Sequence, residues 1–281
     1  MPDVPLLLVD GHALLWRAVF GFPARITSRD KTRDVTGVFG FLALLRAAIR
    51  DELPAAPEVV VVFDGENGVA QRRQADAAYK SHRPVDAAAL APVKSLPDVK
   101  RGLDVVGLPW IEIDDAEADD VIAALVRLAG PERDIWIMSG DRDFYQLVTA
   151  RVRVVNTAMR PGQRVIRRKE IEARYGVAPH RWCDRVALVG DPADGLPGVR
   201  CIGTVTAARL LADGLGIEDL PGSGRLTGRA GRLLSEGFDQ VLLWRDLVRM
   251  RTDVAVPQEL SGCPAPPLPP AADVVAALGL W

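Results

Sequence analysis

Short apolar runs alternate with helix-like segments over the first 155 residues, and this alternation limits the folds open to the chain. Each run is four or five residues long and ends in polar or turn residues, which is typical of a buried strand. Strands that alternate with helices predict an α/β fold with a mostly parallel sheet covered by helices on both faces. The strand runs are Leu6–Val9, Val59–Phe63, Trp110–Ile113, Ile135–Met138 and Val152–Val155, and the helical segments are Val38–Ile49, Leu96–Val106 and Asp119–Ala129.

The pattern changes after about residue 180, where short helical segments and Gly/Pro turns replace the strands. A length of 281 residues suits a core domain with a smaller module. We expect a core over residues 1–180, a helical module over 181–256 and a proline-rich tail over 257–281. Six prolines between Pro257 and Pro270 predict an extended wrap or linker, followed by a terminal helix over Ala271–Leu280.

The cysteines and the apolar runs indicate the compartment. The three cysteines lie far apart without a CxxC pair, so neither a disulfide framework nor a zinc site is indicated. No apolar run approaches the roughly 18 residues that a membrane span needs, and the first one follows an acidic start rather than the basic start of a signal peptide. We therefore expect a cytoplasmic protein with no membrane partner.

Charge is distributed unevenly along the chain. The formal net charge of -2 leans against a nucleic-acid protein, which is usually basic. However, residues 1–150 hold 17 basic and 23 acidic residues, whereas residues 151–185 hold 10 basic and 3 acidic ones. The basic block favours a surface that faces phosphates, with an ordinary solvated face as the alternative.

Acidic residues follow the predicted strands at the points where these strands end. In a parallel α/β sheet the carboxyl ends of the strands meet at one edge, where binding sites form. A later turn, residues 190–195, adds two more acids. The nine carboxylates expected at this edge belong to Asp10, Asp64, Glu117, Asp119, Asp120, Asp141, Asp143, Asp191 and Asp194.

Each acid alone has an ordinary explanation as an N-cap or as a partner of a helix dipole. Nine converging carboxylates would repel one another unless cations neutralised them. Hard oxygen ligands suit Mg²⁺ or Mn²⁺ rather than zinc, and a two-metal site is a common device for phosphodiester hydrolysis. The histidines His12, His82 and His180 are not needed for such a site, and we interpret them as structural or surface residues.

These acids stand in motifs that, in this order, resemble the bacterial 5′ nuclease family, which is flap-endonuclease-like. The resemblance is strongest to the N-terminal 5′-3′ exonuclease domain of DNA polymerase I, and it covers residues from about 6 to 255. Since no polymerase segment follows, it implies a free-standing member. The motifs are Leu8-Val9-Asp10-Gly11, Val62-Phe63-Asp64, Tyr79-Lys80-Ser81-His82-Arg83-Pro84, Glu117-Ala118-Asp119-Asp120, Gly140-Asp141-Arg142-Asp143, Gly190-Asp191-Pro192-Ala193-Asp194 and Leu196-Pro197-Gly198-Val199 followed by Ile202-Gly203.

The resemblance implies a three-layer PIN-like core, a helical arch near residues 79–100 and a helix-hairpin-helix-like module that grips duplex DNA. Asp10, Asp64, Glu117 and Asp119 would lie toward one metal ion, and Asp143, Asp191 and Asp194 toward the other. Asp120 and Asp141 would sit between the two ions or behind the ligands.

At the base of the arch, Lys80 and Arg83 would meet the scissile phosphate as catalytic residues, on one face if this segment is helical. Tyr79 would stack on a displaced base, and Arg17 is a further phosphate-binding candidate.

The family's hairpin corresponds here to residues 198–203, whose backbone would hold duplex phosphate, with K⁺ as a bound ion. The DNA-binding residues of this hairpin are Gly198, Val199, Arg200, Ile202 and Gly203. The sequence departs from the family pattern at Cys201, where glycine is usual, at Val205, where lysine is usual, and at Gly195, where asparagine is usual.

The resemblance therefore implies a monomeric, structure-specific 5′-3′ exonuclease or flap endonuclease of DNA replication or repair. It would use two Mg²⁺ or Mn²⁺ ions to cut DNA at a 5′ flap, nick or 5′ end, or at RNA primer ends, and would leave 5′-phosphates. A nuclease-inactive DNA-binding relative and a PIN-type single-strand RNase are the alternatives. A phosphatase of the haloacid dehalogenase type would need a second Asp at position 12, where the chain has His12.

Overall fold

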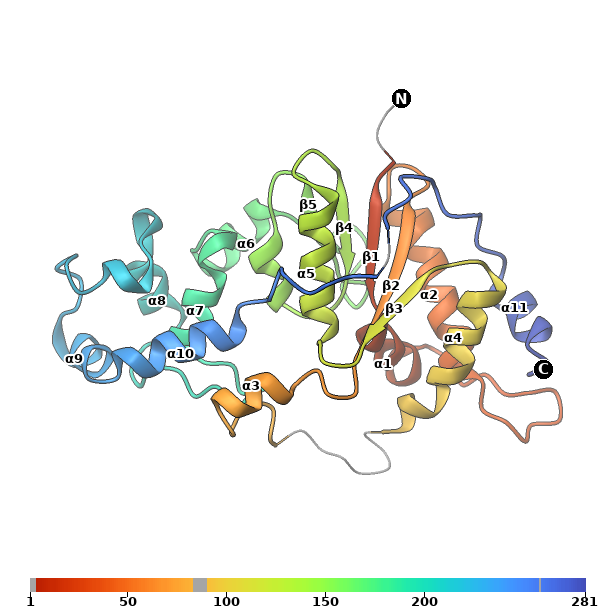
Figure 1. Cartoon of the computed structure of the whole chain (residues 1–281), viewed down its shortest axis with the longest axis horizontal. Coiled ribbons are helices and arrows are strands. Elements are labelled where there is room, and N and C mark those ends of the chain that lie inside the picture. Colours follow the sequence, from red (N-terminus) through yellow and green to blue (C-terminus); the bar gives the residue numbers. More distant parts are fainter. Residues whose placement is uncertain (1–3, 83–89, 258) are drawn as a thin grey trace.

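Six strands form one sheet in the computed structural model, which describes residues 4–82, 90–257 and 259–281 (Figure 1). Strands β1 to β5 are parallel, and β6 is antiparallel to β5. All five predicted strands are confirmed, whereas β6 has only two residues and is too short for a periodic signal. The strands are β1 Leu6–Asp10, β2 Glu58–Asp64, β3 Trp110–Ile113, β4 Ile135–Met138, β5 Val152–Val155 and β6 Val165–Ile166.

The strand order, β3-β2-β1-β4-β5-β6, places the first strand in the middle of the sheet. The chain passes from β1 outward to β2 and β3, and then returns to the other side of β1 to add β4 and β5. Parallel α/β sheets bind ligands at such a reversal, beyond the carboxyl ends of the strands. Here those ends point downward in Figure 1, toward α1 (Gly11–Gly21) and α3 (Ala70–Ala75).

Alternate residues of β1 enter two separate hydrophobic cores, one on each face of the sheet. Leu6 and Leu8 pack into the core that includes α5 (Ala118–Ala129). Leu7 and Val9 pack into the core that includes α1. Because successive strand residues point to opposite faces, this alternation creates three layers.

Two further helices cover the same face as α1, namely α2 (Thr36–Glu52) and α4 (Leu96–Val105). The helices predicted for these segments and for α5 are confirmed, with ends that move by at most three residues. The three-layer α/β architecture predicted for the core is therefore the observed one.

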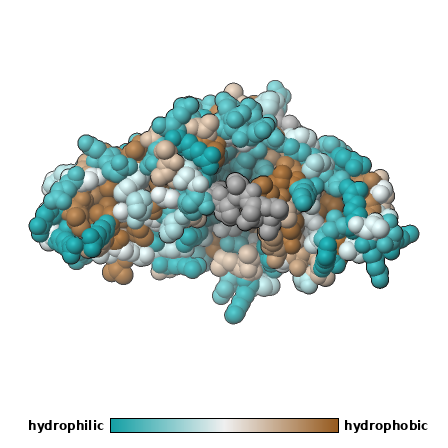
Figure 2. Space-filling view, turned by 90° about the horizontal axis from the view of Figure 1, so that it is seen from below, coloured by the Kyte–Doolittle hydropathy of each residue, from teal (hydrophilic) through white to brown (hydrophobic). Residues whose placement is uncertain are grey.

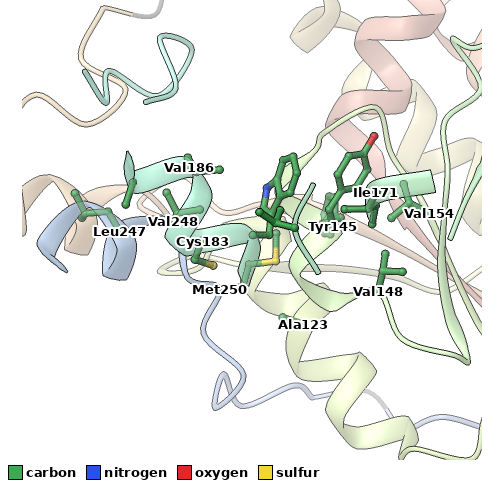
Figure 3. Close-up of a cluster of buried hydrophobic side chains, with 14 of the residues drawn as sticks. Ala123, Tyr145, Val148, Val154, Ile171, Cys183, Val186, Leu247, Val248 and Met250 are labelled. Carbon is green, nitrogen blue, oxygen red and sulfur yellow. The ribbon is translucent and has the colours of Figure 1, made fainter. Parts of the chain in front are cut away.

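The helical module lies beyond the β5 side of the sheet (Figure 1). Its hydrophobic core is continuous with the core on the α5 face, and Figure 3 shows Ala123 of α5 together with Tyr145, Val186 and Leu247. The module is thus packed onto the α/β layers rather than tethered to them. Its helices are α7 Trp182–Val189, α8 Thr204–Leu210, α9 Gly228–Glu236 and α10 Phe238–Val248, and α6 Arg168–Tyr175 precedes it. Across the chain, short 3₁₀ turns occur at η1 Ala91–Ser95, η2 Asp143–Leu147, η3 Pro179–Arg181, η4 Ala212–Gly214 and η5 Ile217–Asp219.

The proline-rich tail is an extended wrap rather than a loose linker. After α10 the chain runs back across α5 to the sheet (Figure 1). There the backbone N–H groups of Ser261 and Gly262 donate to the carboxylate of Glu58, at 2.6 and 3.1 Å. The tail ends in α11 (Ala271–Ala277), which packs on α2 and α4 and is shorter than predicted. The domain limits 1–180, 181–256 and 257–281 remain a prediction.

The predicted arch near residues 79–100 is described only at its two ends. Residues 77–82 form turns rather than a helix, and η1 begins the described part on the far side. Arg83 lies outside the described residues. Across the described ranges, no helix is both long enough and apolar enough to cross a membrane.

Candidate active site

A cavity of about 700 Å³ opens at the carboxyl ends of the strands. Figure 2 looks onto this end of the molecule, which is hollowed near its middle. Lys80 lines the cavity together with five of the nine predicted acidic residues. These five are Asp10, Asp64, Glu117, Asp119 and Asp141.

Asp10 is held in place by the turn that joins β1 to α1. Its carboxylate accepts the backbone N–H of Ala13 at 2.9 Å, as an N-cap does, and the hydroxyl of Ser139 at 2.8 Å. Burial and the neighbouring carboxylate of Asp64 raise the pKa of Asp10 to about 7, although both hydrogen bonds act in the opposite direction. A cation beside Asp10 would favour the charged carboxylate and so oppose this rise in pKa.

His12 has a structural role, as expected for the histidines, but one directly beside the site, because it contacts Asp64. The backbone N–H of Asp64 donates to Nδ1 of His12 at 3.0 Å, and the same Nδ1 lies 3.3 Å from the Asp64 carboxylate. The other Asp64 oxygen accepts the N–H of Ala118 at 2.7 Å. His12 and His82 both line the cavity, and the only sequence signal was the position of His12 two residues after Asp10.

Asp141 lies between two acidic groups. Burial and then the charge of Asp141 raise the pKa of both Asp119 and Asp143 well above the usual value. Asp191 and Asp194 add to the rise at Asp143, whereas Asp10 and Asp64 add to the rise at Asp119. The acids at the four strand ends and in the 190–195 turn are therefore close enough to repel one another.

Lys80 is buried beside Glu117 and forms an ion pair with it; the two residues are 6% and 4% exposed. Its backbone adopts the left-handed conformation (φ 50°), and its N–H donates to the carbonyl of Asp194 at 2.9 Å. Arg73 donates to the Lys80 carbonyl at 3.1 Å. Burial alone would lower the pKa of Lys80, but Tyr79, Glu117 and other acidic neighbours outweigh it and raise the pKa. Lys80 therefore presents a fixed positive charge to the cavity.

The structure corrects the expectation for Tyr79. Its side chain is buried, with the residue 3% exposed, and the Lys80 ammonium lies 4.9 Å from the ring centre. A ring enclosed in this way offers no free face to a displaced base. The phenol is 3.5 Å from Glu117, so Tyr79 belongs to the support of Lys80 and Glu117.

Of the two places expected for Asp120, the structure favours the one behind the ligands. Its side chain is fully buried, and both carboxylate oxygens accept hydrogen bonds from Arg72 and Arg251. These four hydrogen bonds use all the acceptor sites of the Asp120 carboxylate, so none remains for a cation, and Asp120 does not line the cavity. Glu117, which accepts from Lys80 and Arg72, keeps free acceptor sites and does line the cavity. We therefore leave Asp120 out of the proposed ligand set.

Arg17 lines the cavity, as a phosphate-binding residue should. One of its terminal nitrogens donates to the carbonyl of Gly21 at 2.5 Å, at the end of α1. This bond holds the guanidinium at the cavity wall. Its contact with phosphate remains a prediction.

The predicted hairpin, residues 198–203, connects α7 to α8. Val199 and Ile202 are buried, at 9% and 5% exposure, so their side chains anchor the loop and only their backbone is available to DNA. Gly198 has φ 67°, and a Cβ there would lie 2.4 Å from backbone atoms of Val189 and Gly190. Its small size thus serves internal packing.

Arg200 and Gly203 are the hairpin residues best placed to face a ligand. Arg200 is exposed, and a Cβ on Gly203 would meet open space. Cys201 has φ 71°, which explains why glycine suits this position. Val205 is 84% exposed, although it is apolar, at the position where lysine is usual.

Several arginines of the basic block are paired within the protein. Arg151 and Arg153 contact Asp134, at 3.6 and 3.1 Å, and Arg164 contacts Glu52 at 3.1 Å. These pairs reduce the charge that the block presents to solvent. A phosphate-facing role for the block remains a prediction.

The carboxylate oxygens around the cavity suit a hard divalent cation, although they are not arranged as a complete coordination site. Among the described residues, no three Asp, Glu, His or Cys side chains are arranged as a ready-made metal site. The acids around the cavity nevertheless supply only oxygen donors, which Mg²⁺ and Mn²⁺ prefer. Their repulsion, seen in the raised pKa values of Asp10, Asp119 and Asp143, is of the kind that a bound cation offsets.

Two family models match adjoining parts of the chain, which together cover residues 5–269. Residues 5–176 match the N-terminal resolvase-like domain of the 5′-3′ exonuclease, and residues 177–269 match the C-terminal SAM fold of the 5′-3′ exonuclease.

Curated relatives are DNA polymerases I. The thermostable DNA polymerase I of Thermus filiformis is 37% identical over 265 residues, which are 90% of this chain and 29% of that protein. DNA polymerase I of Deinococcus radiodurans is 36% identical over 217 residues, which are 75% of this chain and 21% of that protein. The chain thus spans less than a third of the length of these relatives.

Solved structures share the fold. A T5 5′-exonuclease mutant superposes with a TM-score of 0.66 at 20% identity, covering 98% of this chain and 93% of its own. The catalytic core of Rad2 in complex with a DNA substrate superposes with a TM-score of 0.57 at 16% identity, covering 98% and 86%.

Proposed function

Because the chain belongs to the 5′-3′ exonuclease family, we propose that it is a metal-dependent 5′ nuclease that hydrolyses DNA phosphodiesters. The observation that carries this proposal is the cavity in which five carboxylates converge around the buried ammonium of Lys80. Such a site can bind cations and can also stabilise negative charge on a phosphate.

Eight acids form the proposed ligand set. Asp10, Asp64, Glu117 and Asp119 would hold one divalent cation, and Asp143, Asp191 and Asp194 the other. Asp141 would bridge the two groups, since its charge raises the pKa of acids in both. Two such cations, when bound, activate a water molecule and stabilise the leaving oxygen.

The remaining groups position the reacting phosphate. Lys80 stabilises the charge that grows on the phosphate oxygens, because its ammonium is fixed at the cavity wall before substrate arrives. Arg17, which also lines the cavity, binds a neighbouring phosphate. Ser139 and His12 hold Asp10 and Asp64 in orientation through the hydrogen bonds described above.

The proposed substrate is DNA with a 5′ flap, a nick or a free 5′ end, and RNA primer ends are a second class to be tested. The helical module would bind the duplex beside the cavity through Arg200 and the backbone of the hairpin. K⁺ would be the ion bound at the hairpin backbone. We propose that the protein acts as a monomer in the cytoplasm, on Mg²⁺ or Mn²⁺, in replication or repair.

Cleavage of a defined flap tests this function. Purified protein with Mg²⁺ or Mn²⁺ should cut a 5′-flap or nicked duplex and leave 5′-phosphates. Asp141→Ala and Asp191→Ala should abolish cutting while the flap still binds in Ca²⁺. No cleavage by micromolar wild-type protein would instead support a nuclease-inactive DNA-binding relative. Cleavage of single-stranded RNA alone would support a PIN-type RNase.

A further inference from the structure

Arg72 connects the candidate active site to the end of the helical module. It lies on α3, just before the arch, and its side chain is 11% exposed. One terminal nitrogen donates to Glu117 at 2.5 Å and to Asp120 at 2.9 Å. The other donates to Asp120 at 2.7 Å. A single guanidinium thus joins a proposed metal ligand to a buried anchor.

The same guanidinium also binds the chain that leaves the module. Its Nε donates to the carbonyl of Leu247 at 2.9 Å, near the end of α10, and a terminal nitrogen donates to the carbonyl of Arg249 at 3.2 Å. These contacts and those to the two carboxylates account for all five N–H groups of Arg72. No smaller cation could replace them together, because lysine has three donors and no planar fork.

Arg251 completes the connection from the opposite side of Asp120. Its backbone N–H and its Nε donate to the two oxygens of Asp120, at 2.8 and 2.9 Å. Its terminal nitrogens donate to Gln71 and to the carbonyl of Asp115, at 2.7 and 3.0 Å. Arg251 therefore ties the end of the module both to α3 and to the loop before α5.

A third contact joins the same segment to the second acidic group. Gln146 lies in η2, three residues after Asp143. Its side chain donates to the carbonyl of Val248 at 3.1 Å and accepts the N–H of Met250 at 3.0 Å. Figure 3 shows Val248 and Met250 in the cluster of buried hydrophobic side chains. Residues 247–251 therefore contact Arg72, which binds Glu117 of the first acidic group, and Gln146, which follows Asp143 of the second.

We infer that Arg72 is a positioning residue that holds Glu117 for metal binding, and that Asp120 and Arg251 fix Arg72 to the end of the helical module. The inference rests on the proposed function, which makes Glu117 a ligand. Charge supports it, because Arg72 and Arg251 neutralise the buried Asp120 and leave Glu117 shared between Arg72 and Lys80. The orientation of Glu117 then depends on how the helical module packs on the core.

A double-mutant cycle between Arg72 and Glu117 tests this inference. Arg72→Lys keeps the charge beside Asp120 but loses the fork, and it should lower kcat on flap DNA about tenfold or more while KM changes little. In the Glu117→Gln background the same change should cost less than about twofold, because the ligand it positions is already gone. Equal losses in both backgrounds would overturn the positioning role.

A readout independent of activity is the rise in Tm that Mn²⁺ produces. Arg72→Lys should reduce this rise, Glu117→Gln should reduce it to a similar extent, and the double variant should show no further loss. Arg127→Gln is the matched control, since Arg127 donates to the carbonyl of Thr252, next to Arg251, from an exposed site. It should keep the wild-type rise. An unchanged rise in Arg72→Lys would contradict the inference.

Failure of the nuclease function and failure of the Arg72 inference can be distinguished. If wild-type protein cuts no substrate, the proposed nuclease function fails. The rise in Tm with Mn²⁺, compared between the single and double variants, still tests the coupling of Arg72 to Glu117. If Arg72→Lys does not fold, Arg251→Gln replaces it, because that change leaves every Arg72 contact to Glu117 in place and weakens only the anchor. Its effect on the Mn²⁺ rise should again vanish in Glu117→Gln, and persistence of the effect would contradict the inference.

Discussion

The ammonium of Lys80 and the carboxylate of Glu117 form a buried ion pair at the wall of the cavity, although 37 residues separate them in the chain. Lys80 comes from the turns before the arch and Glu117 from the N-terminus of α5. The pair brings a fixed positive charge into the middle of an acidic site. This arrangement allows one cavity to attract cations and to stabilise a phosphate at the same time.

Replacement of Lys80 should affect turnover far more than DNA affinity. Lys80→Ala removes the charge that stabilises the reacting phosphate, so we expect the single-turnover cleavage rate to fall by about 10²–10³-fold. Flap affinity, measured in Ca²⁺, should change much less, since we propose that the helical module makes most of the duplex contacts. Lys100→Ala is the matched control, because Lys100 pairs with Glu112 outside the cavity. Equal losses of rate and affinity for Lys80→Ala would assign it to binding alone.

Divalent cations should stabilise the folded protein. Repulsion among the carboxylates opposes folding, and a cation that binds only the folded state offsets it, by about 2.7 kcal/mol at a hundredfold excess over Kd. Thermal unfolding with Mn²⁺ and with EDTA measures the effect as a difference in Tm. Asp141→Asn should shrink this difference and also raise the Tm in EDTA, because it removes the charge shared by both acidic groups. A Tm that ignores Mn²⁺ would contradict the metal site.

His12 should be needed for activity even though it is no ligand in this account. His12→Ala removes the acceptor for the Asp64 N–H and so loosens the end of β2, which carries the Asp64 carboxylate. We expect a loss of about 10- to 100-fold in metal affinity or activity, as for other residues that orient ligands. His180→Ala is the control, because His180 is exposed on η3 and does not line the cavity. Full activity of His12→Ala, measured at limiting Mn²⁺, would refute this role.

Val205, which stands where lysine is usual in the family, should weaken duplex binding, and a lysine at this position should strengthen it. Val205 is 84% exposed, so Val205→Lys adds a charge without disturbing the core. One new phosphate contact should raise duplex affinity and steepen the slope of log K against log salt by about 0.9. Fluorescence anisotropy at several salt concentrations measures both. Val105→Lys, at a 52% exposed site on α4, is the control and should leave the slope unchanged. The same slope change in both variants would argue against a specific contact at position 205.

The sheet and its acidic edge could be predicted because their signals are local. The runs that became β1 to β5 carry their own apolar pattern, and the acids that end them meet because parallel strands share one carboxyl edge. Asp10, Asp64, Glu117, Asp119 and Asp141 line one cavity for this reason.

The parts that could not be predicted depend on contacts distant in sequence. Asp120 stands in the same motif as Asp119, but Arg251, 131 residues later, helps to bind its carboxylate. The burial of Tyr79 likewise depends on tertiary packing, since its motif alone is compatible with an exposed ring. The role of His12 required the position of β2 beside α1, which no spacing in the sequence reveals.

The most direct test of the central claim is the single-turnover rate of 5′-flap cleavage as a function of Mn²⁺ concentration, for wild type and Asp141→Ala. We predict that wild-type protein cuts the flap, that the rate rises more steeply than first order in Mn²⁺ before it saturates, and that EDTA or Asp141→Ala abolishes it. Absence of cleavage at every Mn²⁺ concentration, or cleavage that persists in EDTA, would contradict a two-metal nuclease built on these carboxylates.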